Sequence, residues 1–404
     1  MVPGNHDALE AVLRHAALLD DDDYDDIAPA LDALSACGDT SLVPRLREAL
    51  GRFLDDRNFY GRDLTARVLA GIQGVAALPA LLAASARDIG DDQDSLQAEI
   101  VGLLRTDRER ARRTVLAFAT GNAPGLRRMG VWALGYVAGA QDLDLLAAAA
   151  SDADPGIRSA AIGAIPDPAG DERAFGVLLG ALGDFNEQVR VSAASRLGYT
   201  GRRDAVPPLA SLVTDPAPRV RTMAAYALGR LGQAEAAGAL LRLLRDPDGD
   251  VREQAVRALG GAGGPTAVDA LLALAAEADP QRRAQAAAAL AAAAGTDPRA
   301  WPQVMMLARD QESGVRAAVL SGAAGTAGLQ PEWAQLVARL ADDPDPVVRR
   351  RVAATVRHLA PDAARYILTR YATDRDQRVR QVASTGLDRL ADRLDEASAD
   401  GLTP

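Results

Sequence analysis

The sequence predicts an all-α protein built as an α-solenoid, a curved superhelix of about 10–12 stacked helical hairpins. Three observations carry this prediction: the chain has 404 residues, its apolar residues are mostly small, and one motif recurs at a regular spacing. Hydrophobic residues make up 48% of the chain but aromatic residues only 4%, and alanine, a strong helix former, supplies much of the difference. Thin helical layers suit this composition better than one large core, which a chain of this length usually exceeds.

Charge, cysteine and histidine content exclude several classes of function. The net charge of −10 weighs against binding to nucleic acid or to an anionic membrane through overall electrostatic attraction. The single cysteine, Cys37, excludes intrachain disulfides and multi-cysteine metal clusters, and the three histidines, His6, His15 and His358, are far apart in sequence. We therefore expect no metal and no cofactor. The N-terminus lacks a signal-peptide pattern and the longest Ala/Leu run, 286–294, is too short to span a bilayer, so we expect a cytoplasmic protein without a membrane segment.

One motif recurs through most of the chain: an aspartate, five further residues and an arginine, followed by a stretch with helical apolar periodicity. Successive arginines between residues 158 and 380 are 31 to 33 residues apart, a regularity that indicates structural repeats. Glu277 replaces the aspartate ahead of Arg283, and upstream Asp56 and Arg62 keep both partners. The complete pairs in the regular part are Asp152 and Arg158, Asp184 and Arg190, Asp215 and Arg221, Asp246 and Arg252, Asp310 and Arg316, Asp343 and Arg349, and Asp374 and Arg380.

The segment 246–260 shows how one repeat is expected to fold. Aspartate and proline end one helix and start the next, because an aspartate oxygen can accept from free backbone N–H groups and proline has a helix-compatible φ. Val251, Val256 and Leu259 then lie on one apolar stripe at helical spacing. A glycine-containing turn and a second apolar helix, 267–276, complete a helical hairpin. Two short helices cannot bury their apolar faces alone, so the hairpins are expected to stack.

The pattern D-P-x-x-x-V-R-x-x-A-x-x-A-L-G, clearest at 215–232 and 246–263, resembles the HEAT-like repeats that are also found in phycobilisome lyases. The resemblance covers about residues 50–392, or roughly ten to twelve units. It implies that the aspartates and arginines of the motif form a ladder of charge-assisted hydrogen bonds between neighbouring units, with a structural role. Gln97 and Gly121 replace ladder residues, so the ladder is expected to be less regular in the N-terminal third.

Composition and repeat register predict three segments. Residues 1–50 are expected to form acidic N-terminal capping helices, 51–392 the repeat array, and 393–404 a disordered C-terminal tail. Terminal repeats need polar outer faces, and both ends are charged, with an acidic run over 20–26 and a charged tail over 388–400.

The second helix of each hairpin begins at the arginine, and the resemblance implies that this helix lines the concave side. Counted from the arginine, the apolar positions are −1, +3, +4 and +7, so +1, +2, +5 and +9 lie on the opposite face. In the units at 127–260, positions +5 and +9 collect aromatic and arginine side chains, the types that carry much of the binding energy at interfaces. The predicted partner-binding residues are Trp132, Tyr136, Tyr199, Tyr226, Arg230 and Arg257.

Structural interpretations of the same residues stay open at this point. The aromatic side chains can fill gaps left by alanine, although that interpretation has to account for their shared helical phase. A second cluster contains five arginines between Arg105 and Arg113. It is either a solvated helix face offset by Asp107 and Glu109 or a contact for an acidic partner.

Phosphate-loop, nucleophile-elbow and common metal-binding motifs are absent from the sequence. We therefore expect a non-enzymatic scaffold or adaptor that holds a protein or peptide partner on the concave face of the array. Two alternatives are a nucleic-acid-binding protein similar to HEAT-like DNA glycosylases, which the acidic net charge disfavours, and a bilin lyase-like chaperone. The sequence identifies neither the partner nor the oligomeric state.

Overall fold

The computed structural model describes residues 4–18, 24–87, 89–90, 93–322 and 331–399, and over these residues the chain is α-helical with 3₁₀ turns and without strands. The chain divides into two compact units, Met1–Ala193 and Ala194–Pro404. The boundary falls within one helix of the repeat series. The prediction of an all-α protein made of stacked helical hairpins is confirmed.

The first unit consists of consecutive hairpins joined by short turns, several of which contain a 3₁₀ turn. Its helices are α1 (Asn5–Ala17), α2 (Tyr24–Ala36), α3 (Val43–Asp55), α4 (Phe59–Gln73), α5 (Leu78–Ser85), α6 (Asp94–Thr106), α7 (Arg108–Ala119), α8 (Pro124–Val137), α9 (Leu143–Ala149), α10 (Pro155–Ala164), α11 (Glu172–Ala181) and α12 (Glu187–Gly198), whose last residues belong to the second unit.

The second unit continues the same alternation of two helices per repeat. Its helices are α13 (Val206–Ser211), α14 (Pro218–Leu231), α15 (Ala237–Leu243), α16 (Gly249–Ala262), α17 (Gly264–Ala275), α18 (Pro280–Ala293), α19 (Trp301–Leu307), α20 (Ser313–Gly322), α21 (Pro331–Leu340), α22 (Pro346–Thr355), α23 (Pro361–Tyr371) and α24 (Gln377–Ala399).

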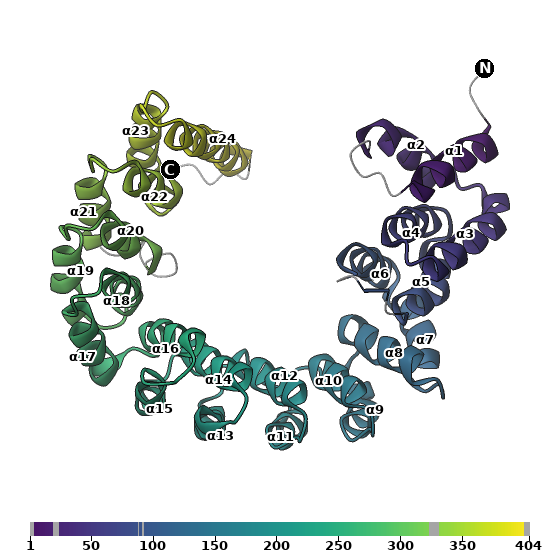
Figure 1. Ribbon diagram of the computed structural model, residues 1–404, viewed down its shortest axis with the longest axis horizontal. Coiled ribbons are helices and arrows are strands. Elements are labelled where there is room, and N and C mark those ends of the chain that lie inside the picture. Colours follow the sequence, from purple (N-terminus) through teal and green to yellow (C-terminus); the bar gives the residue numbers. More distant parts are fainter. Residues whose placement is uncertain (1–3, 19–23, 88, 91–92, 323–330, 400–404) are drawn as a thin grey trace. The chain divides into compact units, whose positions relative to one another are not determined.

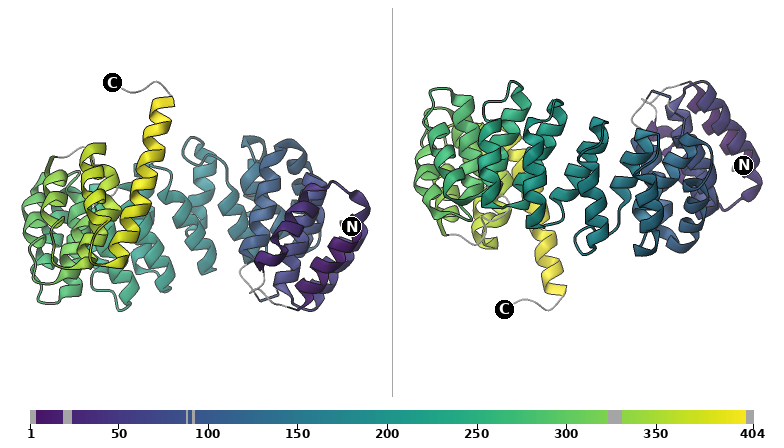
Figure 2. Two further views of the ribbon diagram at one scale, coloured as in Figure 1. Left: turned by 90° about the horizontal axis from the view of Figure 1, so that it is seen from above. Right: turned by 90° about the horizontal axis from the view of Figure 1, so that it is seen from below.

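Each unit has two layers of helices. In the second unit the even-numbered helices pack in sequence, α14 on α16, α16 on α18, α18 on α20, α20 on α22 and α22 on α24. Figure 1 shows that, within this unit, they lie on the inner side of its curve and the odd-numbered helices on the outer side. In the first unit α4, α6, α8 and α10 form the corresponding inner layer. Figure 2 shows the helices of each unit side by side, roughly parallel within a layer.

Glycines let neighbouring inner helices approach closely. A Cβ atom on Gly229 of α14 would lie 2.7 Å from the Ala258 Cα of α16, and one on Gly260 of α16 would lie 2.7 Å from the Ala289 carbonyl oxygen of α18. Backbone atoms cannot yield as a flexible side chain can, so only glycine fits these positions. The Ala-Leu-Gly end of the repeat motif therefore reflects helix packing between units.

The turn before α16 uses two acidic positions rather than one. Asp246 accepts a hydrogen bond from the Asp248 N–H at 3.0 Å, and Asp248 caps α16 by accepting from the N–H groups of Asp250 and Val251. The proline of the Asp-Pro element, such as Pro247, lies in the turn and not in the helix, which corrects its predicted role. A later proline occupies the first helical position in several repeats, at Pro155, Pro218, Pro280 and Pro346.

The ends of the chain bear on the predicted segments. Within the predicted capping segment 1–50, α1, α2 and the first part of α3 are helical. The acidic run over 20–26 lies outside the residues whose side chains the structure describes. The predicted tail begins at residue 393, whereas α24 continues as a helix to Ala399. Residues 400–404 lie outside the described residues.

One helical stretch within the described residues, Phe59–Ser85, is long and apolar enough to cross a membrane by length and composition. More than half of its apolar window is buried inside the first unit. Gly74, with φ of 53°, interrupts the α-helix between α4 and α5, and the 3₁₀ turn that follows joins these helices. Burial and the break are the features of a core segment in a helical repeat.

Candidate partner-binding surface

The junctions between repeats are held by a ladder of arginine–aspartate contacts. Arg221 of α14 donates from Nε and Nη2 to the two carboxylate oxygens of Asp246 in the next repeat, each at 2.7 Å. Its Nη1 donates to the carbonyl oxygens of Asp215 and Pro216 in its own repeat, at 2.8 and 3.2 Å. The planar guanidinium thus joins two successive turns with a bidentate geometry that lysine cannot reproduce.

The same pairing recurs in both units and is bidentate except at Arg127, which donates to its aspartate from Nη2 alone. In each pair the arginine comes from one repeat and the carboxylate from the next, and the donor–acceptor distances lie between 2.7 and 3.1 Å. The pairs are Arg127 with Asp152, Arg158 with Asp184, Arg283 with Asp310, Arg316 with Asp343, and Arg349 with Asp374.

The guanidinium partners hold the pKa of several ladder carboxyls below its usual value. For Asp184, Asp246, Asp310 and Asp374 the hydrogen bond from the arginine is the main cause of the lowered pKa, and burial opposes it. These carboxyls therefore stay ionised in the folded protein at neutral pH. They are structural groups and not candidate general acids.

The ladder is incomplete where the sequence departs from the motif. Arg252 donates from Nη1 to the carbonyl oxygens of Asp246 and Pro247, but it forms no ion pair within the described part of the chain. The next ladder position is occupied by Glu277, whose longer side chain pairs with Arg282 instead. In the N-terminal third other pairs take over, such as Arg112 with the buried carboxylate of Asp142.

Three of the predicted partner-binding residues form one cluster in the second unit. The hydroxyl oxygens of Tyr199 and Tyr226 lie 2.8 Å apart, and the guanidinium carbon of Arg230 lies 4.3 Å from the centroid of the Tyr199 ring. Tyr199 is 58% exposed and Arg230 is also exposed, whereas Tyr226 is half-buried. Stacking on the tyrosine partly fixes the position of the cation. We call Tyr199, Tyr226 and Arg230 the tyrosine–arginine cluster.

The other aromatic pair lies in the first unit. Trp132 and Tyr136 are one helical turn apart on α8, with ring centroids 5.3 Å apart in an edge-to-face arrangement. Tyr136 is 39% exposed and Trp132 is half-buried. Because this pair and the tyrosine–arginine cluster belong to different units, each is a candidate surface by itself.

Arg257 does not join the tyrosine–arginine cluster through any contact that the structure records. It lies on α16, is exposed, and forms an ion pair with Glu253 one turn earlier and a hydrogen bond with Gln254. Its charge is therefore offset within its own helix. Of the six predicted residues it has the weakest structural basis for a contact role.

The arginine-rich segment between Arg105 and Arg113 is partly structural. Arg108 donates to the carbonyl oxygens of Val137 and Ala138 at the end of α8, at 3.3 and 2.8 Å, and Arg112 pairs with Asp142. A positive group at a helix C-terminus satisfies carbonyl oxygens that have no partner within the helix. The spacing in sequence did not reveal these long-range partners, which lie 29 and 30 residues away.

No group of three histidine, cysteine, aspartate or glutamate side chains within the described residues is arranged to hold a metal ion. His358, the histidine at a predicted +9 position, is half-buried. Burial lowers its pKa, as do the neighbouring charges of Arg357 and Arg393. It is therefore a neutral imidazole beside two cations at neutral pH.

The stacked two-helix repeats define a helical repeat protein of the α-solenoid type. The family profile of HEAT repeats matches the sequence over residues 175–255 and 237–324, the region that contains the close glycine–alanine contacts of Gly229 and Gly260. The chain therefore contains HEAT repeats over this region. No curated protein matches the sequence.

Solved structures with a similar fold include several at low sequence identity. An engineered protein is 20% identical, with 86% of this chain and 99% of the other covered at a TM-score of 0.37. The complex of CpcE and CpcF of phycocyanin lyase from Nostoc sp. PCC7120 is 21% identical over 56% of this chain and 92% of the other, at a TM-score of 0.38. A structure of Kap95p with RanGDP is 17% identical over 98% of this chain and 62% of the other, at a TM-score of 0.48.

Proposed function

We propose that the protein is a non-enzymatic scaffold that binds a protein or peptide partner on the inner-helix face of the second unit, in the cytoplasm. The tyrosine–arginine cluster carries this proposal. It presents an exposed tyrosine ring with a stacked guanidinium on the face that the repeat leaves free of packing contacts. HEAT-repeat arrays are often used to bind proteins, which supports the assignment of class but not of partner.

The chemistry of the cluster favours a partner with a carboxylate beside an apolar or aromatic group. Arg230 keeps its hydrogen-bond donors available while its flat face lies on Tyr199. A tyrosine ring contributes a large contact area at a low cost in side-chain entropy, and arginine can donate two parallel hydrogen bonds to a carboxylate. The hydrogen bond between Tyr199 and Tyr226 holds both rings in place before binding.

A pulldown with alanine variants tests the proposal. The wild-type chain and the variants Tyr199→Ala, Tyr226→Ala, Trp132→Ala and Tyr136→Ala are immobilised, and the retained proteins are identified by mass spectrometry. Tyr366→Ala is the matched control, because Tyr366 is 69% exposed but lies on α23 in the outer layer. We expect a partner that wild type and Tyr366→Ala retain and that Tyr199→Ala loses at least about tenfold.

Retention of the same proteins by all four aromatic variants would remove these residues from the binding surface. A loss in Tyr366→Ala equal to that in Tyr199→Ala would point to the outer face instead. Circular dichroism of each variant distinguishes a lost contact from a lost fold, which matters most for the half-buried Tyr226 and Trp132.

A further inference from the structure

A cavity of about 710 Å³ lies in the last repeats of the second unit, between α22, the 3₁₀ turn that follows it, α23 and α24. Small-molecule sites in proteins commonly have volumes of roughly 300–1,000 Å³. Part of the lining belongs to the exposed face of the inner helix α24. Counted from Arg380, the lining residues Val382, Thr385 and Arg389 occupy positions +2, +5 and +9 of α24, the positions that face away from the core in this repeat.

Four apolar residues line one side of the cavity, which we call its floor. Ala353 and Ala354 of α22, Leu368 of α23 and Leu390 of α24 line it. Gly386 contributes to the space, since a Cβ atom there would lie 2.9 Å from Leu368 Cδ2. An apolar group could be buried here without leaving a backbone polar group unpaired, because these lining residues lie within helices.

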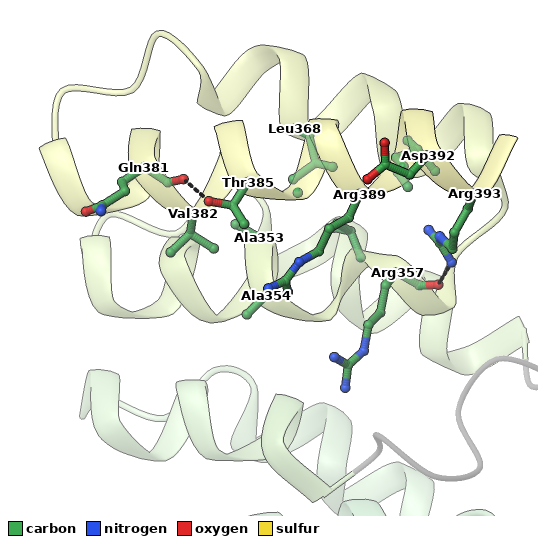
Figure 3. Close-up of a pocket in the computed structure, with 14 residues that line it drawn as sticks. Ala353, Ala354, Arg357, Leu368, Gln381, Val382, Thr385, Arg389, Asp392 and Arg393 are labelled. Carbon is green, nitrogen blue, oxygen red and sulfur yellow. Dashed lines mark hydrogen bonds between the residues drawn. The ribbon is translucent and has the colours of Figure 1, made fainter. Parts of the chain in front are cut away.

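Three arginines line the cavity beside this floor. Arg357 follows α22, and Arg389 and Arg393 come from α24. Figure 3 shows that the Arg389 side chain extends from α24 towards Ala354 of α22 and that Arg393 lies beside Arg357. Arg357 donates from Nε to His358 Nε2 at 3.1 Å, and Arg393 donates to the Arg357 carbonyl oxygen at 3.4 Å.

These three arginines differ from the ladder arginines in their partners. The ladder arginines of the same region, Arg316 and Arg349, form bidentate pairs with carboxylates. By contrast, no ion pair joins Arg357, Arg389 or Arg393 to any acidic residue whose side chain the structure describes, a set that excludes residues 394–399. Among the residues whose side chains the structure describes, Asp392 is the one acidic residue that lines the cavity. The low pKa of His358, which burial and then Arg357 and Arg393 cause, is consistent with excess positive charge here.

We infer that this cavity is a binding site for a ligand that carries a carboxylate on an apolar chain. The carboxylate would accept hydrogen bonds from Arg389. Arg357 and Arg393 would add positive charge at the rim, and the apolar chain would cover Leu368 and Leu390. A positive rim beside an apolar floor matches this chemistry, because arginine pairs with carboxylates in a forked geometry and the floor offers no polar partner. The inference stands apart from the tyrosine–arginine cluster, and neither depends on the other.

Two sources could supply such a ligand, and the experiment separates them. Octanoate represents a free aliphatic acid, and N-acetyl-Ala-Leu-Leu with a free carboxylate represents the C-terminus of a peptide. Octanol and the same peptide as a C-terminal amide keep the apolar part without the charge, and inorganic phosphate supplies charge alone. Binding of each probe to the full chain is measured by isothermal titration calorimetry.

We expect one site per chain for octanoate, for the peptide acid or for both, and at least about tenfold weaker binding of octanol, the peptide amide and phosphate. The double variant Arg389→Gln/Arg393→Gln should weaken binding at least about tenfold. The matched control Arg350→Gln/Arg351→Gln removes the same charge from α22 residues that do not line the cavity, and it should change the affinity less than about twofold. Asp392→Asn should strengthen binding, because it removes the negative charge from the rim.

The inference is overturned if neither acid binds, or if octanol or phosphate binds as tightly as the acids. Equal loss of affinity in the two double variants would also overturn it, because binding would then follow net charge. Ala354→Phe tests the floor independently, since a bulky side chain at this exposed helical position would fill the space without removing an arginine. Unchanged affinity in Ala354→Phe would likewise contradict a site in this cavity.

Discussion

Two neighbouring junctions of the second unit differ in one feature. Between α14 and α16 the ladder is complete, with Arg221 and Asp246 paired and both nearly buried. Between α16 and α18 Arg252 lacks the carboxylate, because Glu277 stands where the motif has aspartate. Both junctions keep the close glycine–alanine approach, at Gly229 and Gly260. Helix packing alone therefore suffices to stack two repeats. Where the arginine–aspartate pair is present, it further stabilises the packed helices and fixes the register between the two repeats.

The largest expected effect comes from breaking the complete junction. Arg221→Ala leaves the nearly buried Asp246 carboxylate without its partner, and this should lower the free energy of unfolding by about 3 kcal/mol. Arg252→Ala removes only hydrogen bonds to two carbonyl oxygens and should cost about 1 kcal/mol. Urea titrations followed by circular dichroism measure both. Equal losses would contradict the difference between the two junctions.

Glycine substitutions test the packing that both junctions share. Gly229→Ala and Gly260→Ala force a methyl group against the backbone of the next helix and should each cost about 2 kcal/mol. Gly238→Ala, on α15 with nothing within 4 Å of its added Cβ, should instead stabilise the protein by about 0.5 kcal/mol, because alanine is the better helix residue. Thermal unfolding of the three variants gives the signs. A stabilising Gly229→Ala would show that the close approach is absent.

Restoring the aspartate should move the incomplete junction towards the complete one. Glu277→Asp shortens the side chain to the length found at the other ladder positions, so its carboxylate can accept from Nε and Nη2 of Arg252. We expect a gain of about 1 kcal/mol in the free energy of unfolding, a gain that the additional variant Arg252→Ala abolishes. A gain that persists in the double variant would arise from something other than the ladder.

The smallest expected effect is a change in pH dependence. The pKa of Asp246 is lowered in the folded protein, chiefly by the hydrogen bond from Arg221, so its contribution is complete above the unfolded value of about 3.9 and is lost as the pH falls through the lower folded value. The stability difference between wild type and Asp246→Asn should therefore be constant from pH 5 to about 7 and shrink below about pH 4. The control variant Asp269→Asn removes an exposed pair with Arg299. Its free energy of unfolding should differ little from that of wild type, both at pH 7 and at pH 4.

Much of the fold could be predicted from the sequence because the motif arginines recur at a regular interval of 31 to 33 residues. The interval between arginines predicts hairpins, and the +5 and +9 positions place Tyr199 and Arg230 on an exposed face, where the structure has them. The close glycine–alanine approach was not predicted. It depends on the distance between helices of two neighbouring repeats, and the sequence of one repeat does not determine that distance. The same holds for the cavity at the last repeats, which exists because Ala354 and Gly386 leave space between helices that are distant in sequence.

We propose that the inner-helix face of the second unit holds a protein partner. The most direct measurement places the photo-crosslinking residue p-benzoyl-L-phenylalanine at position 199 in one chain and at position 366 in another, both exposed sites in the same unit. Irradiation in cells followed by mass spectrometry should give a discrete protein adduct from position 199 that Arg230→Ala weakens, and none of the same identity from position 366. Adducts of the same protein in equal yield at both positions, or none at 199, would contradict the claim.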